Sequence, residues 1–313
     1  MNYFTETKTD SVQLIQFLAN TTFLLGAADP EMETIKKALV SVYNSYGIKP
    51  NVAQAMLNSQ PVTPASAYKA TRAEYLDKGI ECTVTRKENG YFGINDTDVV
   101  FIECLLPEVG KASNFVVDHH NPGDLGFDGK PEQYWESSSI GEVYRLLQSR
   151  GASPAVLDSA FGKDRYYIAA ADHCPAHAFK GLCPGIDPYY LLQMRASQGA
   201  EFLGISIDAW LDKLAAARDK LSALPMVETP YGKYAVATEN IDFLNHASMV
   251  DGIAVEYRMF PNPTIVQKDA RIKVGLLGAE PELIRYWMEK AIDAYDDVYG
   301  SPERGYCGAY VRS

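Results

Sequence analysis

Short apolar runs alternate with helical periodicity in the first half of the chain. Residues 22–27, 98–105 and 114–118 are compact apolar stretches, largely without polar alternation. Such runs are typical of strands buried on both faces, as in parallel sheets. After Asp29 the apolar residues instead recur at helical spacing, so a strand is predicted to lead into a helix. The alternation as a whole predicts an α/β fold.

A further helix is predicted after the run 114–118. Three consecutive serines, residues 137–139, precede apolar residues at helical spacing, and the pattern ends at Gly151. Glu142 stands three residues after Ser139, where the acid of a capping box is expected. We therefore predict a helix that begins at the serines and carries Glu142 as its capping acid.

The pattern changes in the C-terminal half. Residues 189–224 have mostly helical periodicity, which ends near Pro225. A helix with proline in its first turn is predicted from Pro281 to about residue 296. The strand-like runs between these helical stretches are residues 232–237, 253–257 and 271–276.

The length of the chain favours more than one domain. At 313 residues it exceeds the size at which a single core usually stops growing. We predict a parallel-sheet domain over 1–188, a mostly helical linker over 189–225 and a smaller α/β domain over 226–313, with a cleft between the two domains.

Composition indicates a cytoplasmic protein without a membrane segment. Hydrophobic residues make up 47% of the chain and charged residues 22%, as in ordinary globular proteins. No run of about 18 apolar residues is present, and the N-terminus has no basic region before an apolar one. The five cysteines form no Cys-x-x-Cys pair, which favours reduced thiols.

The net charge narrows the class of partner. A charge of −11 argues against a surface that follows duplex nucleic acid, because such surfaces need clustered lysine and arginine. A small substrate fits better, since cations and a few local arginines can offset the acidic field around a short polyanion.

Metal-capable side chains follow the apolar runs. Asp118, His119 and His120 come directly after the apolar residues 114–117, and Glu103 lies near the end of the run 98–105. The carboxyl ends of parallel strands are where α/β sheets place ligands. Two further acidic places also follow apolar runs, namely Asp29, Glu31 and Glu33 after 22–27 and Asp172 after 167–171.

This set of motifs resembles the DHH phosphoesterase superfamily over most of the chain. Residues 27–33 are similar to the family's first motif, His-x-x-Pro-Asp-x-Asp, and Asp118-His119-His120 to its third. Glu103 and Asp172 correspond to the strand-end aspartates of the second and fourth motifs. The glycine-rich ending 304–309 resembles that of the family's substrate-binding domain.

The resemblance implies a site for divalent cations, two in number, with Mn²⁺ or Mg²⁺ as the metal. Arg304 and Arg258 would bind substrate phosphate from the second domain, and Asp29 would also contact substrate. Ala27 stands where the family has histidine, which removes a nitrogen ligand and favours an oxygen-rich site. The implied metal ligands are Glu31, Glu33, Glu103, Asp118 and Asp172, with His119 and His120 as a ligand and a group contacting the substrate.

Structural interpretations remain open for several of these residues. Asp29 is a good N-cap, and Glu31 and Glu33 suit the positive end of a helix dipole. Asp172 is also a common capping residue, and Arg304 could be a surface residue. A separate structural zinc site could be formed by His173, Cys174, His177 and Cys183.

The resemblance implies a metal-dependent phosphohydrolase or phosphodiesterase. Its substrate would be a short oligonucleotide, a cyclic dinucleotide or a pyrophosphate compound. Two other functions stay open: a non-hydrolytic relative that only binds a nucleotide, which Ala27 favours, and a phosphoryl or nucleotidyl transferase. A homodimer is compatible with each of them.

Overall fold

The computed structural model describes residues 3–64, 66–75, 85–87, 90–92, 98–106, 115–260 and 271–312. Two predictions therefore lie outside the described residues, namely the start of a strand at Asn114 and the state of Cys82. The chain forms two compact units. Unit 1 comprises Met1–Phe127 and Trp135–Ala169, and unit 2 comprises Asp128–Tyr134 and Ala170–Ser313.

Unit 1 is built on a mixed sheet whose centre is parallel. Its strands run in the order β3-β2-β1-β7-β8, and β4 also pairs with β2. Four strands are parallel, as the apolar runs predicted for three of them, while β3 and β4 are antiparallel to β2. The strands are β1 (Thr21–Leu25), β2 (Val52–Leu57), β3 (Gln60–Pro61), β4 (Arg72–Tyr75), β7 (Asp98–Ile102) and β8 (Phe115–Val117).

Three parallel strands end at the same level. Leu25 of β1 is paired with Ile102 of β7, and Ile102 is paired with Val117 of β8. The next residue of each strand therefore emerges at one edge of the sheet. This register brings the segments after β1, β7 and β8 together, as expected for a ligand site in an α/β sheet.

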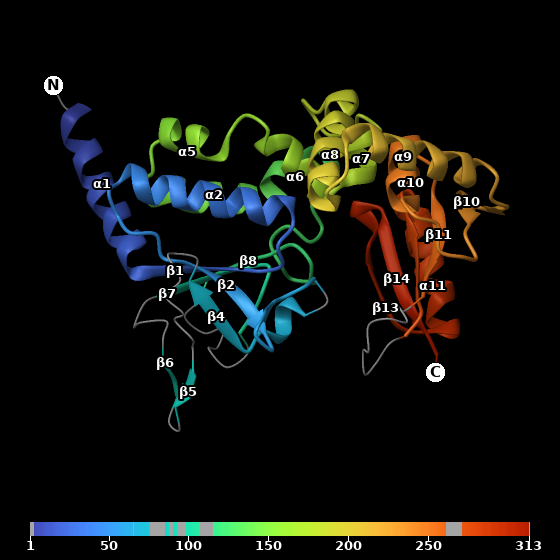
Figure 1. The fold of residues 1–313 in the computed structure, drawn as a ribbon, viewed down its shortest axis with the longest axis horizontal. Helices are drawn as coiled ribbons and strands as arrows, with labels where there is room; N and C mark the ends of the chain where they lie inside the picture. Colours follow the sequence, from blue (N-terminus) through green and yellow to red (C-terminus); the bar gives the residue numbers. More distant parts are fainter. Residues whose placement is uncertain are drawn as a thin grey trace. The chain divides into compact units, whose positions relative to one another are not determined.

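Helices cover one face of this sheet. The ring of Phe23 packs edge-on against Tyr43 of α2 (Pro30–Ser45), with centroids 6.3 Å apart, and α4 (Ser139–Ser149) and α5 (Pro154–Phe161) pack against α2 (Figure 1). Leu24 and Phe101 belong to a separate apolar cluster, which also includes alanines of η1 (Ala67–Lys69) and β4. The remaining elements are α1 (Tyr3–Asn20), α3 (Tyr134–Ser137), the first part of α6 (Arg165–His173) and the antiparallel pair β5 (Thr85–Lys87) and β6 (Gly90–Phe92), while η2 (Pro131–Gln133) lies in unit 2.

The predicted start of α2 is confirmed by the structure, whereas the predicted capping of α4 is not. α2 begins as predicted, with Asp29 as N-cap accepting the N–H of Met32 at 2.8 Å. The capping-box prediction for Glu142 is wrong, because the N-cap of α4 is Ser138, and the third residue after it is Gly141. The run 167–171 is also no strand but part of α6, so Asp172 lies in a helix.

Unit 2 is built on a second mixed sheet. Its order is β13-β14-β12-β11-β10-β9, and only β10 and β11 are parallel. Its strands are β9 (Met226–Thr229), β10 (Gly232–Val236), β11 (Val255–Met259), β12 (Lys273–Leu277), β13 (Tyr295–Ser301) and β14 (Tyr306–Val311). Its helical segments, besides the end of α6, are η2, α7 (Pro175–Phe179), α8 (Pro188–Leu203), α9 (Ile207–Ser222), α10 (Leu244–Asp251), α11 (Pro281–Ala294) and η3 (Pro302–Arg304).

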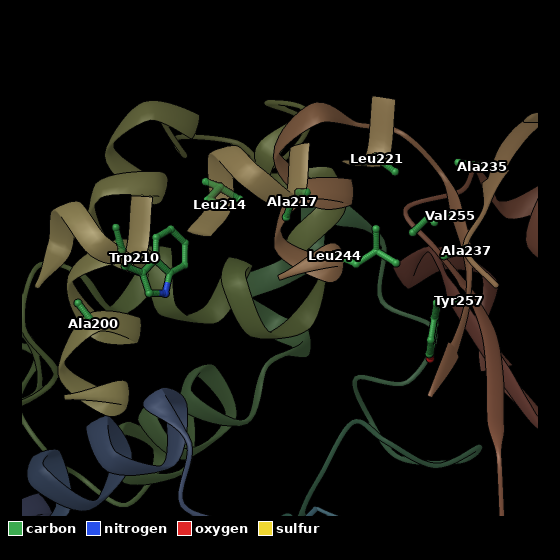
Figure 2. Packing of buried hydrophobic residues seen from close by; sticks show 12 residues of the cluster. Ala200, Trp210, Leu214, Ala217, Leu221, Ala235, Ala237, Leu244, Val255 and Tyr257 are labelled. Carbon is green, nitrogen blue, oxygen red and sulfur yellow. The ribbon is translucent and has the colours of Figure 1, made fainter. Parts of the chain in front are cut away.

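Helices pack on both faces of this second sheet. Neighbouring residues of β10, Tyr234 and Ala235, enter different apolar clusters, because successive strand residues point to opposite faces. One cluster contains Leu283 and Trp287 of α11. The other joins Trp210, Leu214 and Leu221 of α9 to α8, α10 and the strands β10 and β11 (Figure 2).

Residues 189–225 were predicted to be a linker, but they pack within unit 2. α8 and α9 contribute Ala196, Ala200 and Trp210 to the core of unit 2 rather than connecting two separate cores. Their helical periodicity was predicted correctly, but a periodic pattern does not identify the surface that its apolar side covers. The four described cysteines are buried and free. Within the described part of the chain, no helix has the length and apolarity required to cross a bilayer.

Candidate metal centre

Glu103 follows β7 in an unusual backbone conformation. Its φ is +50°, in the left-handed region, and its side chain is buried with 6% exposed. Gly26, after β1, passes so close that a Cβ there would lie 2.9 Å from the Glu103 carbonyl carbon. A left-handed residue other than glycine costs about 1–3 kcal/mol and persists where its surroundings enforce it, often at functional sites. Among the described residues, Glu103 Oε1 has no hydrogen-bond partner.

Asp118 organises the turn after β8. Its Oδ1 accepts the backbone N–H groups of His119 at 2.8 Å and His120 at 3.0 Å. The same oxygen lies 3.0 Å from Nδ1 of His120, and Tyr68 donates its hydroxyl to Oδ2 at 2.7 Å. Burial tends to raise the pKa of Asp118, but hydrogen bonds from His120 and Tyr68 outweigh burial and hold that pKa below its usual value. Asp118 is therefore a charged carboxylate, and it holds the ring of His120 in place.

Both imidazoles are oriented through Nδ1. Nδ1 of His119 lies 3.1 Å from the carbonyl oxygen of Ser137, which can only accept, so this nitrogen carries a proton. Nδ1 of His120 likewise donates to the charged Asp118. With Nδ1 as the donor, Nε2 is the nitrogen of each ring that remains for a metal, the arrangement common in histidine ligands.

The structure brings four of the predicted residues together in unit 1. One ligand atom from each of Glu31, Glu103 and His119 lies within 4.8 Å of the others, and the same holds for Glu103, His119 and His120. Nε2 of His119 is 3.6 Å from Oε1 of Glu103. These groups supply carboxylate oxygens and imidazole nitrogens, donors that can hold a divalent cation.

Glu31 has a structural role as well. It is buried in the first turn of α2, and its Oε1 accepts the N–H of Ile140, in the first turn of α4, at 2.9 Å. Glu31 thus satisfies an N-terminal amide of α4 and favourably places negative charge at that helix end. Both the capping interpretation and the metal interpretation of Glu31 remain compatible with this position.

The remaining predicted residues of unit 1 lie outside these groups. Glu33 is partly exposed and pairs with Lys36 at 2.9 Å on the surface of α2. Asp29 caps α2. We call Glu31, Glu103 and His119, and likewise Glu103, His119 and His120, the two metal-competent groups. Asp118 belongs to neither of them and instead contacts the histidines and Tyr68.

Three predicted residues belong to unit 2. Asp172 lies in the last turn of α6. Arg304 is buried, donating Nε–H to the carbonyl of His173 at 2.7 Å, so it is not the surface residue of the structural interpretation. Arg258 is exposed at the end of β11. Neither metal-competent group of the described residues includes the suggested zinc ligands His173, Cys174, His177 and Cys183.

Sequence reasoning missed three contributors to the site. Tyr68 contacts Asp118 from a position 50 residues earlier in the chain, and no local motif indicates such a contact. Ser137 contributes only its carbonyl, which any residue would supply. Glu142 was assigned to a cap, yet it is buried with 6% exposed and hydrogen-bonds to the backbone of Asp118. Its apolar neighbours Ile140 and Val143 were the signal that could have indicated burial.

We expect the burial of Glu142 to make the stability of the protein depend on pH. Burial raises its pKa to about 7, from an ordinary value of 4.5. Between these values the folded protein binds more protons than the unfolded chain, so stability falls as pH rises from 4.5 to 7. The rise in the pKa of Glu142 from 4.5 to about 7 corresponds to a loss of about 3 kcal/mol in the free energy of unfolding. We expect Glu142→Gln to remove this loss and to exceed the wild type in stability above pH 7.

Urea denaturation at pH 5 and pH 8, in chelator, measures this difference. Glu136→Gln is the matched control, because Glu136 is exposed in the same unit, and it should leave the pH dependence unchanged. Equal pH dependence in the wild type and Glu142→Gln would contradict the prediction.

Comparison with known proteins does not assign this site. The α/β fold and the acid–imidazole group at the ends of parallel strands define a protein with a candidate metal centre. No protein-family model matches the chain, and a search of curated proteins found no matching sequence.

Proposed function

We propose that this protein is a metal-dependent phosphohydrolase or phosphodiesterase that acts on a small phosphorylated molecule. The observation that carries the proposal is the convergence of Glu31, Glu103 and His119 within 4.8 Å. Glu103 adds weight, since its buried Oε1 has no hydrogen bond among the described residues and lies 3.6 Å from Nε2 of His119, so a cation between the two would compensate its charge. The net charge of −11 favours a short substrate over duplex nucleic acid.

The side chains divide into ligands and supports. Glu103 and His119 would hold a cation through Oε1 and Nε2, with Glu31 and His120 beside them. Asp118 and the Ser137 carbonyl would keep both imidazoles in the tautomer that leaves Nε2 for the metal. When bound, divalent cations lower the pKa of a water and neutralise charge on phosphoryl oxygens.

The donor set bears on the identity of the metal. Two imidazoles beside two carboxylates favour a first-row transition ion such as Mn²⁺, because Mg²⁺ and Ca²⁺ prefer oxygen ligands alone. We therefore propose Mn²⁺ ahead of Mg²⁺, with two ions as the number that the family resemblance implies.

A non-hydrolytic relative is the second candidate. Ala27 is buried with 7% exposed, at the position where the resemblance expects a histidine ligand. Glu31 also has a structural partner in the backbone of α4. A site with these changes could bind a metal and a nucleotide without hydrolysing it.

Product release from a panel of substrates separates these functions. The panel contains pyrophosphate, cyclic dinucleotides and short single strands, each incubated with Mn²⁺, Mg²⁺ or chelator. Metal-dependent release would support the hydrolase and name its substrate class. Absence of release by a preparation that binds Mn²⁺ would overturn hydrolysis and favour the binding protein.

A further inference from the structure

Unit 2 contains a recess that none of the metal chemistry uses. Its volume is about 650 Å³, within the range of small-molecule sites. The wall is formed by the end of α8, the start of α9, the segment 239–243, the first turn of α10 and the end of β11. Exposed apolar side chains at this recess are Phe202, Leu203, Met259 and Phe260.

Three aromatic rings line the recess and contact one another. The ring centroid of Trp210 lies 5.2 Å from that of Phe243 and 5.3 Å from that of His246, and Phe243 and His246 are 5.2 Å apart. Burial lowers the pKa of His246 to about 4, so its ring is neutral near pH 7. Trp210 is buried with 2% exposed, so the accessible aromatic surface comes from the half-buried Phe243 and His246, which suit a planar ring.

The backbone at Phe243 is strained. Its φ is +64°, a left-handed conformation that is a genuine outlier for a bulky residue. Phe243 is also the N-cap of α10, where its side chain cannot accept a hydrogen bond from the helix amides. The strained backbone thus places an aromatic ring at the recess, at a position where a helix usually has a polar capping residue. This position is the positive end of the α10 dipole.

One cationic side chain at the recess has no partner among the described residues. Asp242 is paired with Lys213 at 2.8 Å, whereas the guanidinium of Arg258 forms no ion pair or hydrogen bond with a described residue. Glu239 also lines the recess and is exposed to solvent. An anionic group placed at Arg258 would gain charge-assisted hydrogen bonds, because a guanidinium matches carboxylate and phosphate groups in two-point contact.

We propose that this recess in unit 2 is a binding site for a planar aromatic compound that carries one anionic group. The ring would lie against Phe243 and His246, with Trp210 packed behind them, and the anionic group would be held by Arg258. This site stands on residues separate from the candidate metal centre, so it does not depend on the proposed hydrolysis.

Equilibrium dialysis in chelator tests the site with three matched probes. Naphthalene-2-sulfonate has both the ring and the charge, naphthalene-2-sulfonamide has the ring alone, and methanesulfonate has the charge alone. We expect the sulfonate to bind the wild-type chain more tightly than either other probe. Arg258→Gln should weaken sulfonate binding about tenfold or more and leave sulfonamide binding unchanged.

Two further variants establish the location. Arg271→Gln makes the same charge change on the surface of unit 2 outside the recess and should bind the sulfonate as the wild type does. Asn245→Trp, at an exposed position in the recess, should weaken both naphthalene probes by filling the space. Phosphonate and carboxylate analogues of naphthalene then distinguish the two common anions.

Three results would overturn the proposal. They are absence of sulfonate binding to the wild type, equal sulfonate binding by the wild type and Arg258→Gln, and an equal loss in Arg271→Gln. Because all of these measurements are made in chelator, they remain independent of whether the metal centre is active.

Discussion

Glu103→Gln is expected to reduce Mn²⁺ affinity and metal-dependent turnover by more than a hundredfold. Residues that only support a metal ligand change affinity or activity by about 10–100-fold, so loss of a direct carboxylate ligand should exceed that. The substitution keeps the shape of the side chain but removes its charge. Isothermal titration calorimetry measures the affinity, and product release from the responsive substrate measures turnover.

Glu33→Gln is the matched control for this experiment. It makes the same chemical change in a partly exposed side chain that pairs with Lys36, outside both metal-competent groups. We expect wild-type Mn²⁺ affinity and turnover from it. Unchanged Mn²⁺ affinity in Glu103→Gln, with the fold intact by circular dichroism, would exclude Glu103 as a ligand. Lost affinity in both variants would indicate a distributed electrostatic effect instead of a local site.

Phe101→Ala should have the largest effect on stability among the predictions made here. Phe101 is fully buried in β7, where its ring packs with Leu24 and with the alanines of η1 and β4. Truncation of a buried phenylalanine to alanine costs about 3–5 kcal/mol, through lost burial and the cavity that remains. Urea denaturation followed by far-UV circular dichroism measures this loss.

Phe202→Ala provides the same change at an exposed position. The Phe202 side chain is 85% exposed, so its truncation should alter the free energy of unfolding by less than about 0.5 kcal/mol. A loss below about 1 kcal/mol in Phe101→Ala would show that the cluster relaxes around the missing ring.

Three strands of the unit 1 sheet were predictable, because the runs that became β1, β7 and β8 have no polar alternation. The inference that such strands are buried on both faces holds for β1 but not for β8, where Phe115 is exposed. β2 was missed because Gln54 interrupts a short run of small residues. Its amide hydrogen-bonds to the Leu25 carbonyl at 3.2 Å, a tertiary contact that satisfies a buried polar group.

The sequence indicated most of the residues around the candidate site, but not which of them come together and which support the others. Glu31 and Glu33 look alike in sequence, and only the rotation of α2 buries the first and exposes the second. Asp118 resembles a ligand as strongly as its neighbours do, yet its hydrogen bonds depend on Tyr68 and on the form of the turn. Contacts between distant segments decide these roles, and local patterns do not record them.

The level ends of β1, β7 and β8 limit how this protein can change in evolution or by design. Removing one residue from β7 would shift Glu103 by one position and turn its side chain to the opposite face of the sheet. Compensation would require the same deletion in both neighbouring strands. Lengths should therefore vary in the connecting loops of related chains, while these three strands keep a common length.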